Sequence, residues 1–232
     1  MDPIEPRRPT RILQLAVDCL EALAACGLGD RISVGGALGL MHYLEYRETH
    51  DVDAWWLDTA TTEDERTVIE TLEAVLSRTG TVRIRRWGDV VSVELQQDRR
   101  TVFSFQLARP SARLEPPRPA PWIAVQLDGF KDLVASKMVA LVERGAPRDF
   151  RDVYAVCSAG LIAPDTCWTL WRARQQLAGS EPDPERARLA LESHLTRIAL
   201  HRPLEQIPDA DQRLEAATVR TWFRTEFIDA LL

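Results

Sequence analysis

The sequence lacks any long apolar run. No stretch of its 232 residues approaches the roughly 20 consecutive apolar residues that a membrane-spanning helix requires. Residues 1–9 carry prolines and charges where a secretory signal would have an apolar segment. Both absences argue against a membrane protein, and the cytoplasm is the expected compartment.

Cysteine and histidine are scarce, with four residues of each. The cysteines, at positions 19, 26, 157 and 167, form no C-x-x-C pair, and the histidines form no H-E-x-x-H motif. These absences disfavour a disulfide framework and a zinc site. We therefore expect the cysteines to be buried free thiols.

An excess of positive charge is also absent, since the formal net charge is −6. Nucleic-acid binding over a whole surface depends on clustered Lys and Arg, so this balance disfavours it. One local basic group remains, made of Arg83, Arg85, Arg86, Arg99 and Arg100. It has two open interpretations: a groove for nucleic acid, or charges that protect an exposed edge strand from aggregation.

The order of sequence patterns predicts an α+β fold. Alternating short runs between residues 82 and 107 indicate an antiparallel part of a sheet, and the chain after residue 126 is helical in character. Asp128 is expected to cap the helix that it precedes. We predict two domains, residues 1–125 and 126–232. Helices are expected at 11–26, 36–46, 61–78, 128–144, 148–159, 164–178, 184–199 and 211–232, and strands at 31–34, 51–57, 82–85, 90–95, 102–107 and 122–127, the last of these at an edge.

The first motif combines a glycine pair with an acidic pair. Gly35 and Gly36 follow a predicted strand, and Asp51 and Asp53 begin another strand after a short helix. Side chains at positions i and i+2 of a strand leave the same face, so the two carboxylates should project together while Val52 is buried. Glycine lets the backbone approach an anionic ligand closely. This arrangement is typical of a Mg²⁺ and nucleotide site.

The second motif places charged residues inside apolar helical stretches. Lys137 lies beside an apolar stripe, where burial of an ammonium group is costly without an anionic partner. Asp149 and Asp152 are three residues apart, and so are Arg148 and Arg151. Taken alone, the segment is explained equally well by a functional site, or by Asp149 as a helix cap with surface ion pairs around it.

Together the two motifs resemble the AbiEii/AbiGii family of nucleotidyltransferase-like toxins, in the DNA polymerase β type nucleotidyltransferase superfamily. The resemblance covers about residues 12–157. It is carried by Gly35, Gly36, Arg47, Thr49, Asp51, Asp53, Lys137, Ala140, Leu141, Arg144, Arg148, Asp149 and Asp152.

The resemblance implies a nucleotidyltransferase-like mixed β-sheet with flanking helices, followed by a helical C-terminal region. It implies transfer of a nucleotidyl group from an NTP to RNA, in some relatives tRNA, or to protein, by the toxin of a toxin–antitoxin or phage-defence pair. Asp51 and Asp53 would hold Mg²⁺, and Asp149 or Asp152 would orient Lys137 or assist proton removal. Residues implied to contact the nucleotide are Gly35, Gly36, Arg47, Thr49, Lys137 and Arg148.

Two positions depart from the family pattern. Ala37 stands where relatives often have Ser or Thr, and Gln106 occupies the position of a third metal carboxylate. Glu94 is a replacement only if its strand is adjacent. The departures keep a second hypothesis open, a catalytically degenerate module that binds a protein or nucleic acid. A glycosyltransferase, which also uses D-x-D, is a weaker alternative because the motif around Lys137 would then have no role.

Overall fold

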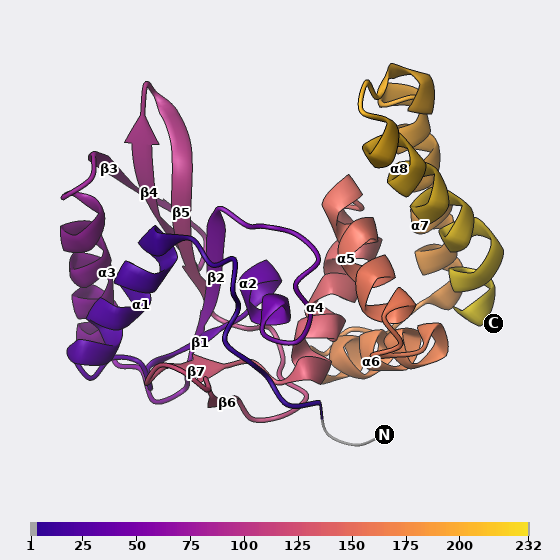
Figure 1. Cartoon of the computed structure of the whole chain (residues 1–232). Helices are drawn as coiled ribbons and strands as arrows, with labels where there is room; N and C mark the ends of the chain where they lie inside the picture. The colour runs from indigo at the N-terminus through magenta and orange to yellow at the C-terminus, as the bar shows by residue number, and fades with distance from the viewer. Residues whose placement is uncertain (1–3, 232) are drawn as a thin grey trace. The chain divides into compact units, whose positions relative to one another are not determined.

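A mixed β-sheet occupies the first part of the chain. The computed structural model describes residues 4–231 and divides into two compact units, Met1–Leu133 and Val134–Leu232. The division falls inside helix α4 (Phe130–Glu143), later in the chain than the expected boundary at residues 125 and 126. The sheet and its flanking helices form the first unit (Figure 1).

Seven strands of the described chain pair in the order β3-β4-β5-β2-β1-β7-β6. Strand β2 is antiparallel to β1 and parallel to β5, so the sheet is mixed and the α+β prediction is confirmed. The expected edge strand 122–127 is wrong, because β7 lies between β1 and β6. The strands are β1 (Ile32–Val34), β2 (Asp51–Trp56), β3 (Thr81–Trp87), β4 (Val90–Gln97), β5 (Arg100–Ala108), β6 (Arg118–Pro119) and β7 (Gln126–Leu127).

Two helices cover the apolar face of the sheet. Helices α1 (Gln14–Ala25) and α3 (Thr62–Leu76) lie side by side and bury their apolar stripes against it (Figure 1). Helix α3 begins at a capping box, in which Thr61 and Asp64 each accept a backbone N–H of the other. From the sheet, the core receives Val52, Ala54, Trp56, Val93, Phe105 and Leu107.

The opposite face of the sheet is polar where β2 crosses it. Burial alternates strictly along β2, with Val52 buried and Asp51 and Asp53 half-buried, so the predicted common face of the two aspartates is confirmed. The β-sheet register places Asp51 opposite Ser104 and Asp53 opposite Gln106 on β5. A short helix, α2 (Gly36–Met41), precedes β2 in the chain and is shorter than the expected 36–46.

Strand β3 forms one edge of the sheet, and all its residues except Val82 are exposed. Arg83, Arg85 and Arg86 lie on this strand, as the edge-protection interpretation requires. The Arg85 guanidinium lies 5.6 Å from the ring centroid of Trp87 and 3.7 Å from the carboxylate of Glu94. The alternative of a nucleic-acid groove remains a hypothesis.

The second unit is helical. After α4 it contains α5 (Pro147–Ser158), α6 (Pro164–Leu177), α7 (Pro184–His201) and α8 (Ala210–Trp222). Proline opens α5, α6 and α7, where its missing N–H costs no helical hydrogen bond. The chain continues through a 3₁₀ turn (Leu204–Gln206), a π-helical turn (Phe223–Phe227) and a last 3₁₀ turn (Asp229–Leu231).

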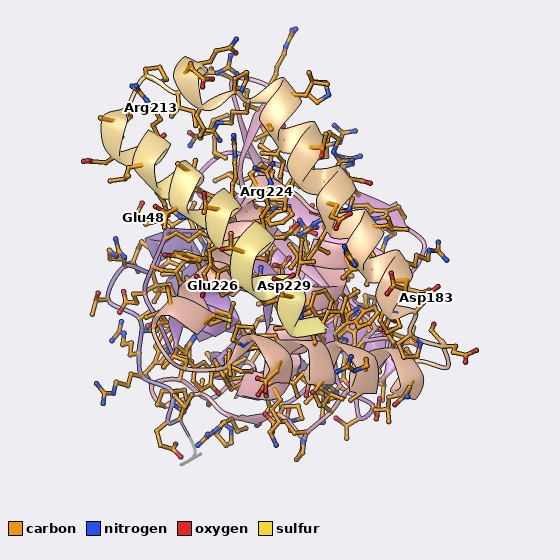
Figure 2. All side chains as sticks on the ribbon, turned by 90° about the vertical axis from the view of Figure 1, so that its right-hand side faces the viewer. Glu48, Asp183, Arg213, Arg224, Glu226 and Asp229 are labelled. Atoms are coloured by element: carbon orange, nitrogen blue, oxygen red, sulfur yellow. The ribbon has the colours of Figure 1, made fainter. Side chains whose placement is uncertain are left out.

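Aromatic residues hold the helical unit together. Trp168, Phe223 and Phe227 are fully buried, and the Trp168 indole N–H donates to the Phe227 carbonyl at 2.9 Å. Charged side chains, Arg213 and Glu226 among them, line the outside of the C-terminal helical segment (Figure 2). Within residues 4–231, no helix has the length and hydrophobicity that a membrane crossing requires.

The cysteines are free thiols, as expected, but not all are buried. Cys19 and Cys167 are buried, and burial raises the pKa of the Cys19 thiol to about 12. Cys26 is exposed, because it is the C-cap residue where α1 ends. The expectation of burial is therefore wrong for Cys26, and Cys157 is only partly buried.

His42 is a buried neutral imidazole. It is 3% exposed, its Nε2 accepts the indole N–H of Trp122 at 3.0 Å, and its Nδ1 lies 2.9 Å from the Leu38 carbonyl oxygen. This pattern requires the proton on Nδ1. Burial lowers the pKa of His42 because it disfavours the charged imidazolium.

Acidification should therefore destabilise the chain through His42. His42 takes up a proton at the ordinary histidine pKa in the unfolded state, but only at a lower pH in the folded state. Its contribution to the free energy of unfolding is therefore fully present above the ordinary pKa and is lost as the pH falls below it. Between pH 7 and pH 5, we expect the unaltered chain to lose more unfolding free energy than His42→Gln, because the pKa of His42 is lowered in the folded state. Urea unfolding at both pH values measures this, with exposed His201→Gln as the control. An identical pH dependence in His42→Gln and the unaltered chain would contradict it.

Candidate active site

The acidic pair is anchored by its neighbours. The Asp51 carboxylate accepts a hydrogen bond from the Ser104 hydroxyl at 2.8 Å, across the parallel pairing of β2 and β5. The Asp51 backbone N–H donates to the Thr49 hydroxyl at 3.3 Å, at the point where the strand begins. Asp51 is thus fixed by both its strand partner and the preceding loop.

The glycine pair lies directly against Asp53. The Gly35 N–H donates to the Asp53 carbonyl at 2.8 Å, and Gly36 adopts a positive φ of 59°. A Cβ at Gly36 would lie 2.0 Å from the Asp53 carboxylate, closer than any real contact. Gly36 is therefore required for two reasons: the left-handed backbone and the space that Asp53 fills.

The third carboxylate position holds an amide. Gln106, which the family resemblance assigns to this position, lies directly opposite Asp53 on β5. Glu94 is not a replacement, because β5 separates its strand from β2. Its carboxylate is bound instead by Gln96 at 3.2 Å and Thr101 at 3.3 Å, besides the ion pair with Arg85. Within the described chain, no three His, Cys, Asp or Glu residues are grouped as metal ligands.

A second polar cluster lies on the other side of the glycine pair. Asp128 follows β7, is 4% exposed, and its Oδ1 accepts the Ser33 hydroxyl at 2.7 Å. The Arg113 guanidinium donates to the same hydroxyl at 3.0 Å and lies 4.0 Å from Asp128 Oδ1. A Cβ at Gly35 would lie 2.9 Å from Asp128 Oδ2. Asp53 and Asp128 therefore each contact one glycine of the pair.

The three residues of this cluster were not among the candidate site residues predicted from the sequence. The expectation that Asp128 caps the following helix is wrong, because α4 begins only at Phe130 and Gly129 directly precedes it. The Asp128 carboxylate instead accepts the Ser33 hydroxyl. One signal was present: Asp128 follows a strand parallel to β1, and Gly35 follows β1 itself. Residues at the carboxyl ends of neighbouring parallel strands gather at one edge of a sheet. Arg113, in a proline-rich connection, gave no such signal.

The residues of the second motif pair with each other. The Lys137 ammonium lies 2.7 Å from the Asp152 carboxylate, and both side chains are largely buried, which confirms that Lys137 faces an anion. Asp149 instead accepts two hydrogen bonds from Arg144, both at 2.8 Å, and one from the Ala146 N–H at 3.1 Å. Of the two aspartates, Asp152 orients Lys137, and Asp149 caps α5.

The two motifs belong to different units. Asp51 and Asp53 lie in the first unit, and Lys137, Asp149 and Asp152 lie in the second. Their convergence on one nucleotide remains a prediction, as do the nucleotide contacts assigned to the other implied residues. Arg47 lies against the Tyr46 ring and donates to the Glu48 carbonyl, while Arg148 is exposed.

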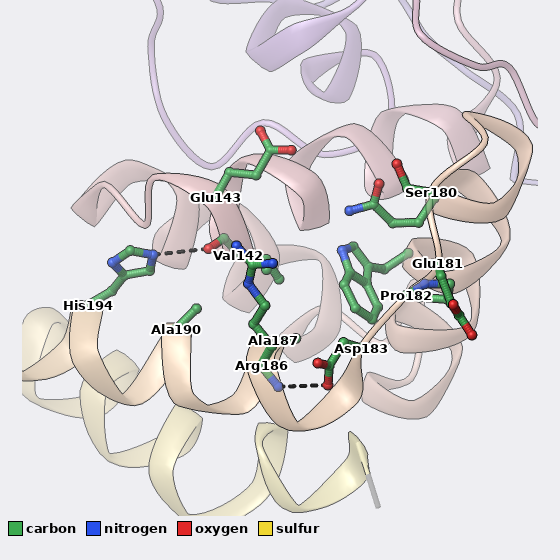
Figure 3. A pocket seen from close by; sticks show the side chains of 12 residues that line it. Val142, Glu143, Ser180, Glu181, Pro182, Asp183, Arg186, Ala187, Ala190 and His194 are labelled. Atoms are coloured by element: carbon green, nitrogen blue, oxygen red, sulfur yellow. Dashed lines mark hydrogen bonds between the residues drawn. The ribbon is translucent and has the colours of Figure 1, made fainter.

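A cavity of 470 Å³ opens among the helices of the second unit (Figure 3). It is lined by residues of α4, α6, α7 and the loop before α7, and no residue of either motif contributes to it. Figure 3 shows the two hydrogen bonds along its wall, from His194 to the Val142 carbonyl at 3.0 Å and from the Arg186 N–H to Asp183 at 3.0 Å. All residues that line the cavity belong to the second unit.

Comparison with known proteins agrees with this geometry. The profile of the family described as "Nucleotidyl transferase AbiEii toxin, Type IV TA system" matches residues 18–223. The chain belongs to this family. The match extends beyond the expected 12–157 and through most of the helical unit, so the resemblance identified from two motifs is confirmed over a longer range. The enzyme class is nucleotidyltransferase.

One solved structure supports the fold of this AbiEii-family chain. A protein from H. pylori, described as a candidate nucleotidyltransferase, has a TM-score of 0.52 at 14% identity, over 93% of this chain and 94% of that one. A nucleotidyltransferase-like antigenic protein from Paracoccidioides brasiliensis has a TM-score of 0.36 at 16% identity, over 91% and 95%. No curated protein sequence matches the chain. The first likeness shows the fold; the second carries no argument.

The contact between Gly36 and Asp53 predicts that two glycine-to-alanine substitutions differ in their effect on stability. Gly36→Ala places a Cβ against the Asp53 carboxylate, whereas Gly88→Ala meets nothing within 4 Å at a similar φ of 52°. Both changes incur the left-handed backbone penalty of about 1–2 kcal/mol. We expect Gly36→Ala to lower the free energy of unfolding clearly further than Gly88→Ala in urea titrations. Equal losses would show that Asp53 does not require the glycine.

The buried ion pair predicts a strong effect of removing one partner. Asp152→Ala leaves the Lys137 ammonium without its anion, and breaking a buried pair in this way costs about 3–5 kcal/mol. We expect the double variant Lys137→Met with Asp152→Leu to recover part of the loss, because the Lys137 ammonium is then removed together with its anion. Chemical unfolding of the full chain measures both. A single variant as stable as the unaltered protein would rule out a stabilising role for the pair.

Proposed function

We propose that this AbiEii-family enzyme transfers a nucleotidyl group from an NTP to a hydroxyl of RNA, including tRNA, or of protein. The observation that carries the proposal is the carboxylate pair of β2, which lies on one face beside the Gly35–Gly36 turn. A strand that presents two fixed carboxylates next to a glycine turn is suited to hold a metal-bound polyphosphate.

The donor set fits one Mg²⁺ ion. Magnesium in nucleotide sites is held by one or two carboxylates together with substrate phosphates, and Asp51 and Asp53 supply that number. Gln106 offers a neutral amide opposite Asp53, so the chain lacks the third carboxylate that a second ion would favour. When bound, the ion would neutralise charge that develops on the phosphoryl oxygens.

The proposed reaction is a displacement at phosphorus. The acceptor hydroxyl oxygen forms a bond to the α-phosphorus, and the bond from that phosphorus to the bridging oxygen breaks. Pyrophosphate leaves with the bonding electron pair, and the hydroxyl proton passes to water. Asp51 and Asp53 contribute position and negative charge, and Ser104 fixes the orientation of Asp51. A phosphate contact by Lys137 belongs to the proposal through the family resemblance.

The proposal includes an antitoxin partner. The family description places its members in type IV toxin–antitoxin systems, and we extend this assignment to the chain. A cytoplasmic site of action follows from the need for an NTP and an RNA or protein acceptor.

A non-catalytic binding module is the second candidate, favoured by Gln106 at the third carboxylate position. A nucleotide-transfer assay distinguishes the two candidate functions. An enzyme transfers label from an NTP and releases pyrophosphate, whereas a binding module does neither.

Transfer should depend on both aspartates. We expect the purified chain, with Mg²⁺ and each α-labelled NTP, to label total RNA or protein, and chelation of the metal to abolish the labelling. Asp51→Asn and Asp53→Asn should each reduce the rate by at least about a hundredfold, a size typical for loss of a preorganised electrostatic group.

The matched control is Asp58→Asn, since Asp58 is exposed beyond the end of β2. It should retain the full rate. No transfer with any NTP, or equal rates in all three variants and the unaltered chain, would refute the proposed function.

A further inference from the structure

Arg113 lies beside the carboxylate pair, on the same face of the sheet. Its guanidinium binds the Ser33 hydroxyl, and Ser33 pairs with Trp55 across β1 and β2. Trp55 and Asp53 are two residues apart on β2, so Ser33 and Asp53 share a face and are diagonal neighbours, with Cα atoms about 7–8 Å apart. All these residues belong to the first unit. Arg113 is therefore close to Asp53 and to the glycine turn.

Buried groups hold Arg113 in this position. Asp128, at 4% exposure, accepts the Ser33 hydroxyl, and that hydroxyl accepts one N–H of Arg113. The Asp128 carboxylate lies 4.0 Å from the guanidinium, so its charge stabilises the cation without a second hydrogen bond. Ser33 and Asp128 both lie on strand-anchored backbone, because the Asp128 N–H donates to the Val34 carbonyl at 3.0 Å. The guanidinium is thereby oriented by the sheet itself.

Most hydrogen-bonding capacity of Arg113 remains unused. A guanidinium has five N–H donors, and within residues 4–231 only one of those of Arg113 donates to a protein acceptor. The side chain is 20% exposed, so part of it reaches the surface. An oriented cation with unused donors next to a carboxylate pair is suited to an anion with several oxygens. Phosphate groups match the planar fork of arginine.

We propose that Arg113 binds the β- and γ-phosphates of the NTP and stabilises the pyrophosphate as it leaves, with Ser33 and Asp128 as positioning residues. The inference rests on the proposed function and names the phosphate-binding cation of the first unit. Asp128 acts through Arg113, because its Oδ1 accepts the Ser33 hydroxyl and lies 4.0 Å from the Arg113 guanidinium.

Polyphosphate binding tests this role directly. The probe is inorganic tripolyphosphate with Mg²⁺, titrated calorimetrically into the full chain. We expect Arg113→Ala to weaken binding at least tenfold and Arg113→Lys to weaken it less, because lysine keeps the charge but not the fork. The matched control is Arg109→Ala. Arg109 lies on the same connection but pairs with Glu65 of α3, so affinity should be unchanged.

A double variant separates binding from folding. Arg113→Ala removes the nearby cation of buried Asp128 and is expected to lower the melting temperature. Arg113→Ala with Asp128→Asn removes both charges, and should recover melting temperature while tripolyphosphate binding stays at least tenfold weaker. A purely structural role for Arg113 predicts the opposite, namely that affinity recovers together with stability.

The outcomes also separate this inference from the proposed function. Tripolyphosphate binding or an NTP KM unchanged by Arg113→Ala would overturn the role of Arg113, while label transfer by the unaltered chain would still support a nucleotidyltransferase. If the unaltered chain transferred no label but its tripolyphosphate binding still depended on Arg113, the proposed function would be refuted and the phosphate-binding role of Arg113 would stand. No binding of the probe by the unaltered chain would overturn the inference.

Discussion

The alternation of side chains along β2 is the constraint on which the rest of the structure depends. Val52, Ala54 and Trp56 face the core beneath α1 and α3, so Asp51 and Asp53 must face the other way. A shift of one residue in the β-sheet register would bury two carboxylates in an apolar core, which makes the register strongly specified. The hydrophobic energy of the core thus also fixes the direction of the functional groups.

Three of the buried carboxylates in this protein lie near a cationic side chain. Lys137 is buried with Asp152, and Arg144 holds both oxygens of buried Asp149. In the first unit, Asp128 is compensated through Ser33 and Arg113. Such pairs add little net stability over apolar residues of the same volume, but loss of one partner is costly. We conclude that they fix the geometry of particular groups more than they stabilise the fold.

The success of prediction differed between elements for physical reasons. Periodicity located the helices and strands of the chain to within a few residues, because burial of one face imposes a period of 2 or 3.6. It predicted too long a strand at 122–127, because a strand of two residues such as β7 is too short to show a period. It also predicted α2 and the helix from residue 211 to be longer than they are. The family pattern singled out Gln106, but its place opposite Asp53 came only from the strand pairing. The separation of Glu94 from β2 also depends on strand order, which no local pattern encodes.

The sequence by itself determined the family, the fold class and the common face of Asp51 and Asp53, since these follow from motif order and from strand geometry. Only the tertiary structure decided which carboxylate each cation meets: Asp152 for Lys137, Asp149 for Arg144, and Asp128 through Ser33 for Arg113. Such partners lie up to 95 residues apart in the chain, as Ser33 and Asp128 do. Strand pairing and helix packing bring them together, so the spacing of residues along the sequence does not predict which partners will interact.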